Sequence, residues 1–346
     1  LFLNNDNVGE ELVSKGNLPN TLKVLSINYV SIRNIEVGSL PSSLTKLDMG
    51  FHPDCRLKPG LLPNGLLHLH LSKDFDHELE PGCLPSSITN LSFGKNFNHI
   101  IEHGVLPPSI TKLEFGDNFN QPLIVGVLPS TITSLKFGRL FIQPVTQDLW
   151  PPSLLNLIIG FNMFYFHLDK IPKPPPTLRY LDMHNTFDQC RFMTSCTSIN
   201  VLRMNIKINP KVEEDIIGSL GVLIVPHNVR ELIFNINSSL EFTKAYIWKV
   251  LSDNSKITSF QIETLSRRFE VRSLDQSREL AVCVCQIQDT CDDTTSKIRF
   301  FRLNLFLNSH SATSKNSIHT SQTAHFMNQM NMMMYQMYLM IHMDHL

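Results

Sequence analysis

The chain has 346 residues, of which 42% are hydrophobic, and its 30 basic and 31 acidic side chains leave a formal net charge of -1. This balance excludes a general electrostatic attraction to nucleic acid or to an anionic membrane surface. No uninterrupted apolar run reaches the ~18 residues that a membrane-spanning helix needs. We therefore expect protein partners, with neither nucleic acid nor a membrane among them.

The seven cysteines are odd in number and do not have the spacing of a structural zinc site. This usage favours free thiols in a reducing compartment, so we expect a cytoplasmic protein. The sequence contains no metal-ligand pattern and no cofactor motif, and we expect neither a metal nor a cofactor.

Residues 1–17 are interpreted as a lead-in to the regular part of the chain. The segment begins with Leu1 rather than methionine, and its acidic residues interrupt the apolar core that a secretion signal would need. We expect the chain to be a fragment, and a further domain such as an F-box before Leu1 is compatible with this.

From residue 18 to 182 the chain repeats itself. A proline recurs every 22 residues, at Pro19, Pro41, Pro63, Pro85, Pro107, Pro129 and Pro151. A fixed period of this length is typical of one supersecondary unit stacked on copies of itself. The period therefore predicts a solenoid.

Each repeat carries the pattern LxxLxL, which ends in the alternation of a strand with one buried face. One short strand per coil, stacked in register, predicts a parallel β-sheet on one face of the solenoid. The middle apolar column is the most constant, and consists of Leu25, Leu47, Leu69, Leu91, Leu113, Leu135 and Leu157.

The rest of each repeat is expected to return along an extended or irregular path with little regular helix, because a Leu-Pro step favours extended backbone. One glycine column precedes this step and another follows the strand, at corners that need either positive φ or close backbone approach. Two asparagine columns follow the strand, represented by Asn96 and Asn98. Either of them could satisfy buried backbone groups of the next coil.

The residues between the apolar columns must point outward from the sheet. We predict that they form a protein-binding face. This face, here named the sheet face, comprises Lys46, Asp48, His68, His70, Asn90, Ser92, Lys112, Glu114, Ser134 and Lys136. A metal site at His68, His70 and Asp48 is conceivable, but exposed hydrogen-bonding histidines explain the pattern better.

The repeats resemble a known family. The units LPSSITNLSFGKNFNHII (residues 84–101) and LPPSITKLEFGDNFNQPL (residues 106–123) are similar to the FNIP repeats of social amoebae. More distantly they resemble the leucine-rich repeats of bacterial LPX proteins. The resemblance implies a leucine-rich-repeat-like solenoid that binds other proteins and is sometimes attached to an F-box or kinase domain.

Beyond the regular array we interpret residues 183–265 as divergent repeats and a C-terminal cap, with a short helix at 239–255. Residues 266–346 are expected to be a low-complexity, disordered tail. The tail ends in a run of methionines and histidines. Copper(I) binding, a short partner helix and a gene-model artefact are alternatives for that run.

Three functions are compatible with these observations. The first is a non-catalytic interaction scaffold that uses the sheet face. The second is the substrate-recognition part of an F-box-type ubiquitin ligase whose F-box lies outside this chain. A remote third is an enzyme of the bacterial LPX ubiquitin ligase type, with the nucleophile at Cys291. No catalytic residue is nominated, because a single exposed sheet offers little concavity that excludes water.

Overall fold

The structure is a computed structural model. It describes residues 1–3, 13–27, 35–50, 56–160, 174–183, 197–206, 228–236, 259–263, 267–273, 281–287 and 299–303. The chain divides into two compact units, Leu1–Ile199 and Asn200–Leu346.

Among its described residues, the first unit contains nine short strands that pair in parallel, each with the next along the chain. Equivalent positions of successive repeats are direct partners, so Leu91 of one strand lies beside Leu113 of the next. The strands are β1 (Phe2–Leu3), β2 (Val24–Ile27), β3 (Lys46–Asp48), β4 (His68–His70), β5 (Asn90–Ser92), β6 (Lys112–Glu114), β7 (Ser134–Lys136), β8 (Asn156–Ile159) and β9 (Tyr180–Met183).

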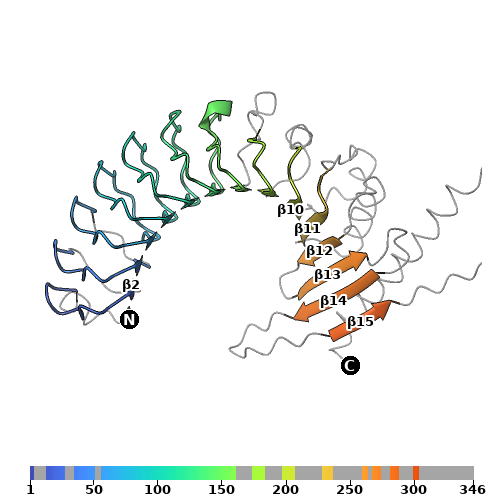
Figure 1. Cartoon of the computed structure of the whole chain (residues 1–346), viewed down its shortest axis with the longest axis horizontal. Helices are drawn as coiled ribbons and strands as arrows, with labels where there is room; N and C mark the ends of the chain where they lie inside the picture. The colour runs from blue at the N-terminus through green and yellow to red at the C-terminus, as the bar shows by residue number, and fades with distance from the viewer. Residues whose placement is uncertain are drawn as a thin grey trace, which may run out of the picture. The chain divides into compact units, whose positions relative to one another are not determined.

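Within this unit the coils fan out as an arc (Figure 1). The strands lie along the inner, concave side of the arc, and the return paths form its outer side. The described return paths contain one 3-10 turn, η1 (Gln147–Leu149). The predicted fold class is therefore confirmed: a leucine-rich-repeat-like solenoid with a parallel sheet on one face and almost no helix.

The repeated proline begins a turn that leads directly into the strand. In each coil its carbonyl accepts a hydrogen bond from the N–H three residues later, as from Ile110 to Pro107 at 3.2 Å and from Ile132 to Pro129 at 3.2 Å. That third residue is the first of the buried apolar columns. The proline thus starts the turn that sets where each coil enters the sheet.

The two glycine columns serve different purposes. The glycines before the Leu-Pro step, such as Gly82 and Gly104, have φ of 87° and 84°. They occupy the third position of a turn, where positive φ favours glycine. Among the glycines after the strand, Gly94, Gly116, Gly138 and Gly160 lie against the backbone of the preceding coil, and a Cβ on any of them would collide with its carbonyl group. There the coils are too close for any side chain.

The core consists of the apolar columns and two rows of phenylalanine. Phe93, Phe115 and Phe137 stack with centroids 5.5 Å apart. Behind them Phe75, Phe97, Phe119 and Phe141 stack at 5.9 to 6.1 Å. All seven rings are buried. Burying one such side chain contributes roughly 1.5 to 3 kcal/mol, so the Phe rows are a large part of what holds successive coils together.

Both asparagine columns bond to the neighbouring coil, which settles the alternative left open by the sequence. Asn98 accepts a hydrogen bond from the N–H of Asn120 at 2.9 Å, and Asn120 accepts one from the N–H of Ile142 at 3.0 Å. This column therefore satisfies backbone groups. In the other column the side chains bond to each other, Asn118 donating to Asn96 at 3.0 Å.

The array starts earlier in the chain than the sequence indicated. Residues 1–17 were expected to be a lead-in, yet Phe2 and Leu3 form β1 and pair with Ser26 and Ile27 of β2. The partners are 24 residues apart, whereas the later repeats are 22 apart. Because this first coil is out of phase with the period, the proline column does not reveal it.

The second unit contains β10 (Val201–Ile206), β11 (Glu231–Ile236), β12 (Ser259–Glu263), β13 (Arg267–Ser273), β14 (Ala281–Ile287) and β15 (Arg299–Leu303). Strands β10 to β12 pair in parallel. Strands β12 to β15 pair antiparallel.

Part of the segment expected to be a disordered tail thus forms strands. The alternation in RRFEVRS and AVCVCQI is a strand signal that the polar composition of the surrounding segment obscured. The expected helix at 239–255, Cys291 and the methionine-rich run lie outside the described residues.

The two glycine columns predict different sensitivities to alanine. Gly116→Ala places a Cβ against the backbone of Gly94, whereas the nearest atom to a Cβ on Gly104 is 4.0 Å away. Gly104→Ala should lower the free energy of unfolding by ~1–2 kcal/mol, the cost of holding a residue with a Cβ in the left-handed region. Gly116→Ala should lower it further or prevent folding, because the neighbouring coil must move to make room for the Cβ. Urea unfolding of both variants measures this, and an equal or reversed order would contradict the assigned roles.

Candidate functional site

The ten residues of the sheet face lie on five adjacent strands, β3 to β7, in two rows. The first row pairs Lys46, His68, Asn90, Lys112 and Ser134 across neighbouring strands. The second row pairs Asp48, His70, Ser92, Glu114 and Lys136 in the same register. All ten are at least partly exposed, while the leucine between them on each strand is buried.

The rows do not stay accessible along the whole sheet. In the second row, Ser26 on β2 is 5% exposed and Asp182 on β9 is 6% exposed. The usable part of the face is therefore its middle. This restriction depends on three-dimensional neighbours of these two residues, which the repeat pattern does not encode.

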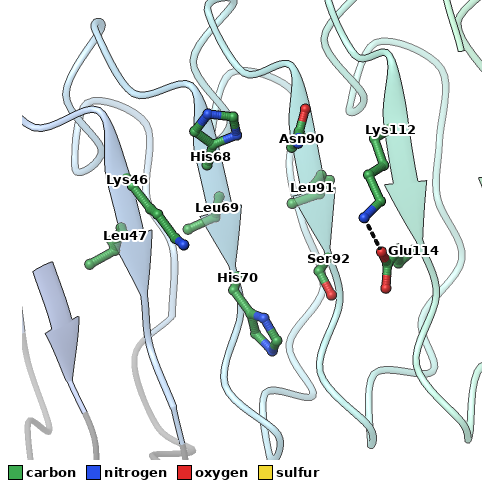
Figure 2. Close-up of a pocket in the computed structure, with 10 residues that line it drawn as sticks. All are labelled: Lys46, Leu47, His68, Leu69, His70, Asn90, Leu91, Ser92, Lys112 and Glu114. Carbon is green, nitrogen blue, oxygen red and sulfur yellow. Dashed lines mark ion pairs between the residues drawn. The ribbon is translucent and has the colours of Figure 1, made fainter. Parts of the chain in front are cut away.

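The middle of the face is hollowed into an open groove of about 440 Å³ that spans β3 to β6. Figure 2 shows the reason: the short side chains of Asn90 and Ser92 on β5 lie between the longer side chains of His68 and His70 on β4 and of Lys112 on β6. The buried leucines of these strands also line the groove. Because their side chains point into the core, they contribute backbone to its floor.

Glu114 is the electrostatic centre of one wall of the groove. Its carboxylate lies 2.7 Å from the ammonium of Lys112 on the same strand and 3.5 Å from that of Lys136 on β7. Partial burial acts to raise the pKa of Glu114, but the Lys112 hydrogen bond and the two positive charges outweigh it, so the pKa lies below its ordinary value. The carboxylate therefore stays ionised and paired with the two lysines.

The other acidic residue of the face, Asp48, is also engaged in an interaction within the protein. Asp48 accepts a hydrogen bond at 3.1 Å from the N–H of Gly50, at the corner that follows β3. Lys46, on the same strand, is exposed, and its side chain extends toward β4 (Figure 2). The carboxylates are therefore engaged within the protein, while Lys46 and the two histidines face the groove.

The described residues contain no group of three or more histidine, cysteine, aspartate or glutamate side chains placed to hold a metal ion. Among the same residues there is no helix that is both long and apolar enough to cross a bilayer. Cys83 is a buried free thiol, and burial raises its pKa. Its sulfur lies 3.2 Å from the carbonyl oxygen of Leu57, which is consistent with a packing role.

Sequence comparison identifies the repeat. Five stretches match the FNIP repeat model, at residues 13–52, 54–96, 75–118, 97–140 and 119–162. These stretches are similar to the FNIP repeat and lie almost wholly within the regular part of the chain. They include all ten positions of the sheet face, so the groove lies wholly within the matched residues. The amoebal origin implied by the resemblance stays a prediction.

Structure comparison agrees with the leucine-rich-repeat-like assignment. Six solved chains match, one of them titled the crystal structure of CroV588, a novel circular LRR protein structure. The chain aligns with it over 73% of its own length, with 26% identity and a TM-score of 0.52. The alignment covers 35% of that protein. No curated protein matches the chain.

The lysine cluster around Glu114 predicts a pH-dependent contribution to stability. Because the folded-state pKa is lowered, the contribution is present at neutral pH and is lost as the pH falls through that pKa. Glu114→Gln should therefore cost about 0.5–1 kcal/mol near pH 7 and nothing once the carboxylate is protonated. Urea unfolding across acidic to neutral pH measures the difference. A cost that is independent of pH would contradict this electrostatic role.

Proposed function

We propose that this chain is a non-catalytic scaffold that binds other proteins through the sheet face. The observation that supports this most directly is the open groove across β3 to β6, lined by polar and charged residues of both signs. Such a surface is shallow and wet compared with the enclosed, largely apolar pockets that hold small molecules. A charge pattern of this kind suits selective recognition of a protein partner.

The construction of the face supports the same proposal. The strands under the groove are bonded on both sides, so their backbone groups are not free to pair with an added strand. Recognition would therefore depend on the outward side chains. Those side chains vary in charge and polarity from coil to coil, while the middle buried column is leucine in every coil from Leu25 to Leu157, which allows a constant framework to carry a specific surface.

Neither ligase alternative gains support from the fold or from the comparisons. The cytoplasmic location expected from the sequence also stays a prediction.

Exchange of two charges on the face tests the proposal. The double variant Lys112→Glu with Glu114→Lys keeps the net charge but reverses the local pattern beside Lys136. Proteins captured by the immobilised chain from a lysate of its source organism, quantified by mass spectrometry, should fall at least about fivefold. Lys58→Glu, at an exposed position on a return path, serves as the control and should leave capture unchanged.

A circular dichroism melt must first show that the double variant is folded. If its capture profile then equals that of the parent chain, the binding face lies elsewhere and the proposal is wrong.

A further inference from the structure

The charges that line the groove are unequally available. Lys46 and Lys112 are the lysines of the lining and Glu114 is its one acidic residue, which leaves a formal charge of two minus one, or +1, with both histidines neutral. Glu114 is held by Lys112 and Lys136. The groove therefore offers positive charge to a ligand and little free negative charge.

Lys46 is the most available of these cations. It is exposed, and no ion pair joins it to another of the described residues. The nearby acidic side chain on its own strand, Asp48, is hydrogen-bonded to the N–H of Gly50. An exposed lysine beside a hollow loses little by pairing with an incoming carboxylate.

The two histidines add hydrogen-bonding ring nitrogens to the groove. His68 is paired in register with Lys46 and Asn90, and His70 with Asp48 and Ser92. The floor residues Asn90 and Ser92 supply neutral hydrogen-bonding groups that are compatible with a carboxylate.

We propose that the groove over β5 docks an acidic linear segment of a partner protein, with Lys46, His68 and His70 as its main contacts. This rests on the proposed scaffold function and names the chemistry of its partner. The argument is charge complementarity: a positive, open groove whose own carboxylates are already engaged selects aspartate and glutamate side chains over basic ones. Binding weakens with added salt.

A displayed library of random linear peptides, selected on the full chain, tests this. Selected peptides should be enriched in aspartate and glutamate. The strongest of them, measured by fluorescence anisotropy, should lose at least about fivefold in affinity with Lys46→Glu and should be unaffected by Lys58→Glu. The double variant His68→Gln with His70→Gln should also weaken binding, because both rings are proposed contacts of the segment.

The outcomes separate this inference from the scaffold function. Enrichment of basic or uncharged peptides would overturn the inference, and so would a selection that enriches no peptide. If basic or uncharged peptides were selected and their binding required Lys112 and Glu114, the scaffold function would stand. Acidic peptides that bind Lys46→Glu undiminished would place their contact outside the groove and overturn the inference too. Displacement of the peptide by a single-stranded DNA of equal charge would show a general polyanion surface instead of a site for an acidic protein segment.

Discussion

The structure depends on one constraint: a coil without helix or hairpin cannot satisfy its own backbone and must bond to the coil beside it. The N–H of Thr111 bonds to the carbonyl of Thr89, and that of Asn118 to the carbonyl of Lys95. At the outer corner Asn120 accepts the N–H of Ile142. Most of these bonds join residues 22 or 23 positions apart, so a constant repeat length keeps successive coils in hydrogen-bonding register. The pairings of β1 with β2 and of β8 with β9 span 24 residues, so a longer coil can also pair. The period thus reflects hydrogen bonding as well as packing.

This constraint divides the residues of each repeat into two classes. The inward apolar residues, the corner glycines and the Asn98–Asn120 column are restricted in type, because each is packed against or bonded to the same position of the next coil. The outward strand positions are not part of the core and differ in charge and size from coil to coil. Asn90 and Ser92 can therefore be short where their neighbours are long, and the groove results from that difference.

Much of the fold could be predicted from the sequence because it is periodic: the parallel sheet, the outward rows and both glycine columns follow from 22-residue spacing. The coil beginning at Phe2 was missed because its spacing differs from that period. The strands at Arg267–Ser273 and Ala281–Ile287 were missed because the polar composition of the surrounding segment obscured their alternation. In the site, residue types and their rows were predictable. The engagement of Asp48 and Glu114, and the burial of Ser26, depend on three-dimensional neighbours and were not.

The most direct test of the central claim is the exchange rate of a single backbone amide. In the structure the N–H of Ile142 bonds at 3.0 Å to the side-chain oxygen of Asn120, one coil earlier. In NMR-detected hydrogen exchange, Asn120→Ala should accelerate exchange at Ile142 by about tenfold, because the only acceptor supplied by the preceding coil is gone. The amide of Asn98, bonded to Asp76, should be unchanged. An unchanged rate at Ile142 would contradict the claim that neighbouring coils satisfy one another's backbone.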